Sequence, residues 1–287
     1  MEVIRAGALT TVQDLGRPGH AHLGVPRSGA LDPPAHRLAN RLVGNPEGAA
    51  GLETTLDGVA LRPLGASAVT VAVTGAPCPV RVAGRPVPWG EPVRVPAGAV
   101  LEVGRPVVGL RSYVAVAGGI DVPAVLGSRA TDLLSGLGPD RPVTGSVLPV
   151  GAPYGPPRGA DGLAAPSVPP AELVLPLLPG PRDDWFAPGT VAGLGGTPYR
   201  VSADGNRIGL RTEGPALVRA REGELPSEGM VLGAVQVPPD GRPVLFLADH
   251  PVTGGYPVIG VVPAEHLPAA AQAVPGTPLR FLPIGRP

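Results

Sequence analysis

The chain has 287 residues, of which 43% are hydrophobic, and its basic and acidic residues balance to a net charge of zero. This length is enough for one large domain or two smaller ones, and the neutral balance gives no support for nucleic-acid binding, which requires a basic face. All basic residues other than histidine are arginine, so a lysine nucleophile or Schiff base is excluded and a permanent cation must be Arg.

Glycine and proline are abundant, with 43 and 41 residues, and they separate short runs rich in valine and other apolar residues. This pattern is typical of many strands joined by many turns, so we predict an all-β fold with few short helices. The single cysteine, Cys78, excludes an intramolecular disulfide, and its proline neighbours favour a structural role. No leader pattern and no membrane-length apolar run are present, which favours a cytoplasmic protein that does not bind membranes.

Along the chain, residues 2–31 read as strand and loop, and residues 32–43 give the clearest helix signal. Asp32 is a suitable cap, Pro33 suits the first helical position and Gly44 suits the end. Residues 52–118 read as strands, with hairpins around 83–84 and around 96–98.

Residues 149–171 are dense in proline, glycine and alanine and show no periodicity, which predicts a linker. The domains are therefore predicted as 1–148 and 172–287. In the second, Asp204-Gly205-Asn206 predicts a turn, and residues 263–274 predict a short helix with Leu267, Ala271 and Val274 on one side.

Two segments carry candidate chemistry. The first, residues 13–32, contains Gln13, Asp14, Arg17 and Ser28 among glycines, a composition that suits either an anion-binding loop or a plain turn-rich surface loop. The second, residues 249–257, follows an apolar strand and suits either a general base with close backbone approach at Gly254-Gly255 or a simple β-turn.

Two further residues remain open between function and structure. Arg207 either reaches a substrate or pairs with a surface acid, and Gln236 within an apolar strand points either inward to a binding site or outward to solvent. No phosphate loop, nucleophile elbow or metal-ligand spacing is present, and no metal site is predicted.

Several ordered segments together resemble the family that comprises the C subunit of 5-oxoprolinase and is also known as allophanate hydrolase subunit 2, with Kip antagonists and biotin-dependent carboxyltransferases among its members. The segments are TTVQDLGRPGH, GVPRSGALD, YVAVAGGIDVPAVLGSRATD, DGNRIGLR, SEGMVLGAVQVPPDGRPVLFLAD and TGGYPVIGVV. The resemblance runs from about residue 10 to residue 283.

This resemblance implies two cyclophilin-like β-barrel halves. It also implies a subunit of a heteromeric 5-oxoprolinase that converts 5-oxo-L-proline to L-glutamate with ATP and magnesium, bound at or shared with a partner. The implied partners are a Kip-inhibitor-like subunit and an amidohydrolase-like subunit. Two alternatives remain, a non-catalytic regulatory subunit that binds a Kip-inhibitor-type partner, and the carboxyltransferase component of a biotin-dependent urea carboxylase.

The expected site is a cleft lined by both halves. Asp249 and Tyr256 are the catalytic candidates, and the substrate-binding candidates are Gln13, Asp14, Arg17, Ser28, Arg207, Gln236, Thr253, Gly254 and Gly255. The family pattern Asp-Arg-Gln-Thr-Thr-Gly-Gly-Tyr reads here as Asp249-His250-Pro251-Val252-Thr253-Gly254-Gly255-Tyr256, so roles of the three replaced residues do not carry over.

Overall fold

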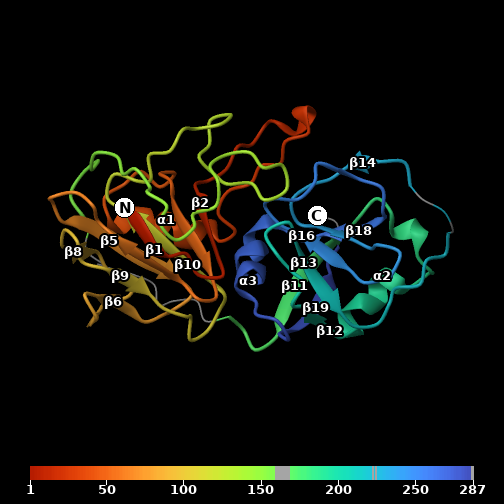
Figure 1. Ribbon diagram of the computed structural model, residues 1–287. Helices are drawn as coiled ribbons and strands as arrows, with labels where there is room; N and C mark the ends of the chain where they lie inside the picture. The colour runs from red at the N-terminus through yellow and green to blue at the C-terminus, as the bar shows by residue number, and fades with distance from the viewer. Residues whose placement is uncertain (159–168, 222, 224, 286–287) are drawn as a thin grey trace. The chain divides into compact units, whose positions relative to one another are not determined.

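The computed structural model describes residues 1–158, 169–221, 223 and 225–285, and strands dominate it (Figure 1). It contains two compact units: unit 1 comprises Met1–Arg17, Ser28–Asp132 and Gly136–Val168, and unit 2 comprises Pro18–Arg27, Leu133–Ser135 and Pro169–Pro287. The predicted all-β class is confirmed. Residues 159–168 of the predicted linker lie outside the described residues, and two short segments of the first half, which composition did not mark, belong to unit 2.

Unit 1 is built from two five-stranded antiparallel sheets. The first has the order β1 (Glu2–Arg5), β4 (Val59–Arg62), β9 (Leu101–Val103), β6 (Val80–Val82) and β7 (Arg85–Val87). The second has the order β2 (Leu9–Gln13), β3 (Gly51–Thr55), β10 (Arg111–Val116), β5 (Val69–Gly75) and β8 (Val93–Val95).

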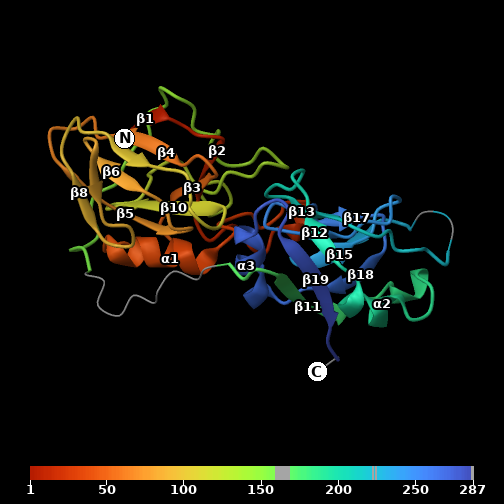
Figure 2. The ribbon, with the colours of Figure 1, turned by 90° about the horizontal axis from the view of Figure 1, so that it is seen from below.

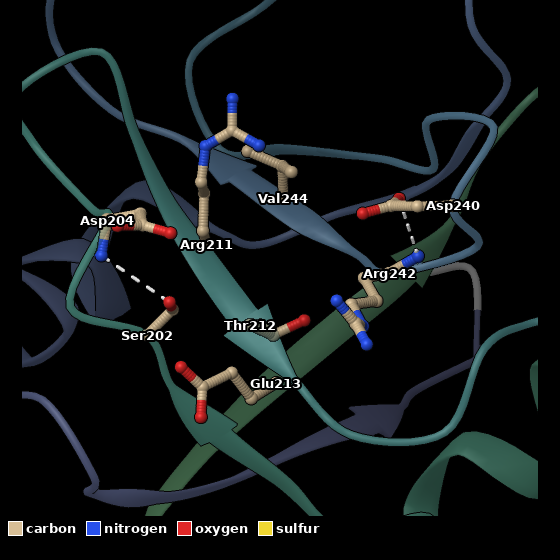
Figure 3. A pocket seen from close by; sticks show the side chains of 8 residues that line it. All are labelled: Ser202, Asp204, Arg211, Thr212, Glu213, Asp240, Arg242 and Val244. Carbon is tan, nitrogen blue, oxygen red and sulfur yellow. Dashed lines mark hydrogen bonds between the residues drawn. The ribbon is translucent and has the colours of Figure 1, made fainter.

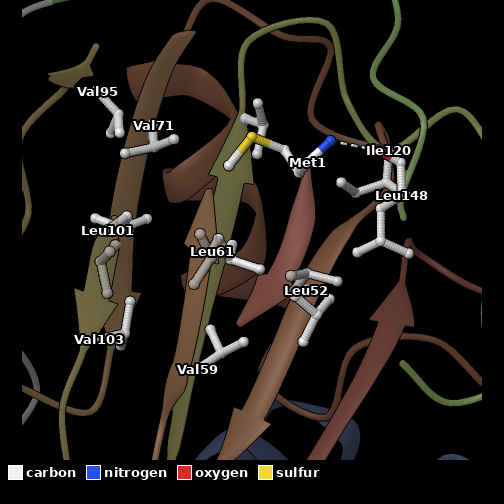
Figure 4. Close-up of a cluster of buried hydrophobic side chains, with 14 of the residues drawn as sticks. Met1, Leu52, Val59, Leu61, Val71, Val95, Leu101, Val103, Ile120 and Leu148 are labelled. Atoms are coloured by element: carbon white, nitrogen blue, oxygen red, sulfur yellow. Dashed lines mark hydrogen bonds between the residues drawn. The ribbon is translucent and has the colours of Figure 1, made fainter. Parts of the chain in front are cut away.

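The core of unit 1 combines side chains from both sheets (Figure 4). Leu61 and Leu101 from the first sheet and Leu52 and Val71 from the second are completely buried. Because alternate residues of a strand point to opposite faces, each short strand supplies one or two such side chains. Burial of each contributes about 1.5–3 kcal/mol to folding.

Helix α1 (Pro33–Leu42) packs on β5 and β10 of unit 1, as Figure 2 shows. The predicted cap is confirmed, because the Asp32 carboxylate accepts a hydrogen bond from the Ala35 N–H at 3.1 Å. The helix also buries His36 and Asn40. Asn40 donates to the Ala49 carbonyl at 2.8 Å and lies 3.1 Å from His36 Nε2, so these buried polar groups are satisfied.

The two predicted hairpins of unit 1 have different outcomes. The first is confirmed, since β6 pairs with β7 across Ala83 and Gly84, both at positive φ. The second is wrong: β8 pairs with β5 and β9 pairs with β4 and β6, so the turn around Gly98 carries the chain from one sheet to the other. Local turn chemistry marks a reversal but does not select the partner strand.

Unit 2 contains a closed seven-stranded barrel. Its order is β11 (Leu173–Pro179), β18 (Val258–Val261), β15 (Ala234–Gln236), β16 (Val244–Phe246), β13 (Gly209–Glu213), β12 (Tyr199–Val201) and β19 (Pro278–Pro283). The parallel pair β11–β19 closes it, with Leu173 opposite Leu279. Closure leaves no strand edge exposed. A separate two-stranded ribbon joins β14 (Glu228–Gly229) to β17 (Thr253–Gly254).

The remaining helices are short. They are η1 (Ala21–Leu23), η2 (Asp183–Trp185), α2 (Thr190–Gly193), η3 (Leu194–Gly196), η4 (Ala264–His266) and α3 (Leu267–Gln272). The helix predicted near the C-terminus is confirmed and buries Leu267 and Ala271, but it ends before Val274. None of the helices in the described part of the chain has the length and hydropathy needed to cross a bilayer.

Candidate substrate-binding site

Four of the predicted residues lie where strand β2 ends in unit 1. Gln13, Asp14, Arg17 and Ser28 are all buried. Asp14 is fully engaged: its carboxylate accepts from the Gly16 N–H at 2.7 Å, the Ser128 hydroxyl at 2.6 Å and the Arg129 N–H at 2.6 Å. These contacts fasten the 128–129 segment against the loop that follows β2.

Gln13 and Arg17 contact consecutive carbonyls of the neighbouring segment. Gln13 Nε2 donates to the Thr131 carbonyl at 2.9 Å, and Arg17 Nη2 donates to the Ala130 carbonyl. Arg17 Nε donates to the Val125 carbonyl at 3.3 Å. The Thr131 N–H in turn donates to the Val12 carbonyl at 2.8 Å, so this segment runs beside the end of β2.

One polar atom on each of these two side chains has no partner. Arg17 Nη1 and Gln13 Oε1 are buried without a hydrogen bond, and among the described residues no carboxylate lies within ion-pair distance of Arg17. Buried polar groups normally have hydrogen-bond partners. A guanidinium donor and an amide acceptor without one, called idle atoms below, are therefore a candidate binding feature.

Ser28 lies in a turn that requires unusual backbone geometry. Its φ is 50°, and its hydroxyl donates to the same Thr131 carbonyl at 3.1 Å. Gly29 follows with a φ of 92°, and a Cβ there would lie 2.7 Å from the Gly16 nitrogen. Only glycine permits this close approach, which presses the turn against the loop after β2.

In unit 2, Arg207 and Asp249 form an ion pair whose side chains are both 0% exposed. Arg207 Nε and Nη2 donate to the two carboxylate oxygens at 2.9 and 3.0 Å, and the Leu133 N–H donates to Asp249 at 3.1 Å. The backbone joins them as well, since the Asp249 N–H donates to the Arg207 carbonyl at 3.1 Å. The catalytic role of Asp249 stays a prediction, and any such role starts from a carboxylate already paired with a guanidinium.

Gln236 is buried and hydrogen-bonded, so it is not the solvated strand residue of the second alternative. In β15, Gln236 pairs across the strands with Val244 and Val258, and its side chain lies on the other face of the strand from Val235. Its Nε2 donates to the Tyr256 carbonyl at 3.1 Å. Met230 Sδ lies 3.9 Å from the same nitrogen. A Cβ at Gly254 would lie 2.7 Å from Gln236 Nε2, so glycine is needed where this ribbon covers Gln236.

Tyr256 is 37% exposed, and the Arg219 guanidinium carbon lies 5.9 Å from its ring centroid. Arg219 Nη2 donates to the Val237 carbonyl at 2.8 Å, whereas its buried Nε has no partner. Thr253 is exposed and lies in the β14–β17 ribbon, and Gly255 approaches the Leu225 carbonyl. Tyr256 is therefore an accessible phenol beside a cation.

A polar groove of about 370 Å³ lies on unit 2 beside the β12–β13 hairpin (Figure 3). Carboxylates and guanidiniums of both signs line it, and it contains none of the predicted site residues; its lining is Ser202, Asp204, Arg211, Thr212, Glu213, Asp240, Arg242 and Val244. Such a mixed, open rim is typical of a solvated surface.

The structure thus groups the predicted residues into three sets: Gln13 with Arg17, Arg207 with Asp249, and Gln236 with Gly254 and Tyr256. That these sets line one cleft stays a prediction. Sequence reasoning missed Thr131 and Arg219. Thr131 contributes a backbone carbonyl, which has no residue-specific signal, and Arg219 lies outside any periodic segment.

The fold and these buried polar sets define an all-β protein with one two-sheet unit and one closed barrel. Comparison with known proteins agrees with this class. The chain is 38% identical to the C subunit of 5-oxoprolinase from Escherichia coli, over 98% of its own length and 90% of that protein. The chain belongs to the family described as carboxyltransferase domain, subdomain A and B, whose model matches residues 23–283.

Solved structures show the same fold in larger proteins. The chain matches TTHA0988 with a TM-score of 0.86 and 37% identity, over 98% of this chain and 55% of that one. It matches Kluyveromyces lactis urea carboxylase with a TM-score of 0.88 and 31% identity, over 99% of this chain and 27% of that one. The chain therefore spans about half or less of these solved chains.

Proposed function

We propose that this chain is a subunit of a heteromeric 5-oxoprolinase that converts 5-oxo-L-proline to L-glutamate with ATP. One observation carries the proposal: at 38% identity the chain corresponds to 90% of the C subunit of a 5-oxoprolinase. By contrast, the chain corresponds to only 27% of the urea carboxylase. The proposed partners are a Kip-inhibitor-like subunit and an amidohydrolase-like subunit.

A lactam is a stable amide, so its opening requires activation of the carbonyl carbon. ATP supplies that activation by creating a leaving group at the carbonyl oxygen. The contribution we propose for this chain is to bind and orient the lactam at its buried polar sets. Gln13 and Arg17 of unit 1 offer an acceptor and a donor for this binding.

No group of three or more histidine, cysteine or carboxylate side chains in the described part of the chain is arranged to hold a metal ion. We propose that ATP and magnesium bind at the partner subunit or are shared with it, and we assign no step on the nucleotide to residues of this chain.

A second candidate function is carboxyl transfer to urea, which the likeness to urea carboxylase favours. Biotin is carried on a lysine, and these 287 residues contain none, so the carrier would have to lie outside them. The two functions require different substrates, and this makes them separable by assay.

The test is glutamate formation from 5-oxo-L-proline and ATP by the purified chain with its two proposed partners, followed by omission of each component. We expect loss of activity when this chain is left out. Equal activity of the partners without it would overturn the proposal. Activity only with urea, bicarbonate and a biotin carrier would favour the second function.

A further inference from the structure

We infer that Gln13 and Arg17 form a two-point binding site for the edge of a small amide, with Gln13 Oε1 accepting the amide N–H and Arg17 Nη1 donating to the amide oxygen. The inference deepens the proposed function, on which the choice of a lactam as probe rests. It starts from the two idle atoms of unit 1.

The backbone fixes the orientation of both side chains. Gln13 Nε2 donates to the Thr131 carbonyl at 2.9 Å and to the Thr11 hydroxyl at 3.0 Å. A flipped amide would set Gln13 Oε1 against the Thr131 carbonyl oxygen, which also only accepts, so Oε1 is the atom left idle. Arg17 is held in the same way by the carbonyls of Val125 and Ala130, which leaves Nη1.

The surroundings of Arg17 are backbone rather than acid. Gly138 packs here so closely that a Cβ on it would lie 3.2 Å from Arg17 Nη2. Arg17 is 1% exposed and donates to two carbonyls, and no carboxylate among the described residues lies within ion-pair distance of it. A further hydrogen-bond acceptor at its guanidinium would therefore stabilise this buried charge. A ligand oxygen is such an acceptor.

The idle pair selects an amide over an anion. A carboxylate or phosphate satisfies Arg17 Nη1 but has no N–H for Gln13 Oε1. In a lactam the N–H and the carbonyl oxygen lie on the same edge of a cis amide, and urea also presents an N–H and an oxygen on one edge. Lactam and urea therefore share the chemistry that this pair recognises.

The experiment uses the assembled enzyme and compares the KM for 5-oxo-L-proline with the inhibition constant of its N-methyl derivative, which lacks the N–H. For the wild type we expect the derivative to bind at least about tenfold more weakly, because it leaves Gln13 Oε1 unpaired. Gln13→Met, which removes the acceptor, should raise KM and bring the ratio to about 1.

Two controls separate recognition from folding. Thr11→Val removes one structural partner of Gln13 Nε2 but leaves Oε1, so the N–H preference should persist. Arg17→Lys should raise KM, whereas Arg111→Lys, a second buried arginine that faces Glu53 instead, should not.

The outcomes distinguish this inference from the proposed function. If the enzyme forms glutamate and Gln13→Met keeps the N–H preference unchanged, the inference is overturned and the proposed function stands. Gln13 Oε1 and Arg17 Nη1 would then be assigned to an internal water. If no glutamate forms, but urea binds and its binding is weakened in Gln13→Met and Arg17→Lys, the inference is supported. The lactam is then rejected as the substrate. If neither compound binds the assembled wild type, both fail.

Discussion

Two residues of unit 2, Arg207 and Asp249, form a charge pair that is completely removed from water. Burial of a charge costs several kcal/mol, and the pair exists because two direct hydrogen bonds between the side chains offset part of that cost. Removal of one partner takes these two hydrogen bonds and the opposite charge of the pair away from a group that stays buried.

We therefore expect Arg207→Met to lower the free energy of unfolding by about 3–5 kcal/mol. The double variant Arg207→Met/Asp249→Leu should lose much less, since neither charge of the pair remains buried. Chemical denaturation measures both, with Arg211→Met on the exposed groove as the control, for which a change within about 0.5 kcal/mol is expected. A single variant as stable as the control would contradict this account.

We expect His36 to give unit 1 a pH-dependent contribution to its stability. Burial is the main cause that lowers its pKa below the ordinary value of 6.5, against the raising influence of Asp14 and Glu53. The unfolded chain thus takes up a proton near pH 6.5 while the folded chain resists it. The stability is fully present above pH 6.5 and is lost as the pH falls below that value.

The expected slope is at most about 1.4 kcal/mol per pH unit for this one proton. Urea denaturation of the wild type and of His36→Gln between pH 7.5 and 5.5 measures it, and the variant should lack this component. His22 is exposed, so His22→Gln serves as a control that keeps the slope. Parallel wild-type and His36→Gln curves would show that another group carries the dependence.

At the scale of elements, the β6–β7 hairpin is closed by a turn that demands two residues at positive φ. Gly84 meets this demand without cost, but Ala83 has a φ of 49° and a Cβ that disfavours it. Asparagine tolerates this conformation better than alanine does.

We expect Ala83→Asn to raise the free energy of unfolding by about 0.5–1 kcal/mol, because it relieves backbone strain in the turn. Ala97→Asn, in the exposed turn that joins the two sheets, is the matched control without positive φ and should give no gain. Thermal unfolding of both variants tests this, and an equal gain in both would indicate a general surface effect instead.

At the scale of the whole molecule, each unit has its own buried cluster. The large cluster that includes Leu61 comes from unit 1 alone, and the one that includes Met230 comes from unit 2 alone. The chain has two tryptophans, and Trp89 falls in unit 1 while Trp185 falls in unit 2. Fluorescence of either residue therefore reports on one unit when the other is replaced by phenylalanine.

We expect Leu61→Ala to lower the stability reported by Trp89 by about 2–5 kcal/mol, because it removes a completely buried side chain. The transition reported by Trp185 should change less. Coincident shifts of both probes would show instead that the molecule unfolds as one cooperative body.

Sequence by itself determined the features that depend on neighbouring residues. Alternating apolar runs and turn residues predicted the all-β class, the Asp32 cap and Gly44 bounded α1, and Ala83-Gly84 predicted a hairpin. Each rests on backbone preferences within a few residues, which do not require knowledge of the rest of the chain.

Only the tertiary structure decided which strands pair and which polar groups remain unsatisfied. Pro96 to Gly98 has the composition of a hairpin turn, yet β8 and β9 join different sheets because the core selects their partners. Gln13 and Arg17 were candidates by residue type, but their idle atoms are set by carbonyls more than a hundred residues away in the chain. Hydrogen bonds to backbone carbonyls depend on where the chain passes and not on which side chain it carries, so no local pattern reveals them.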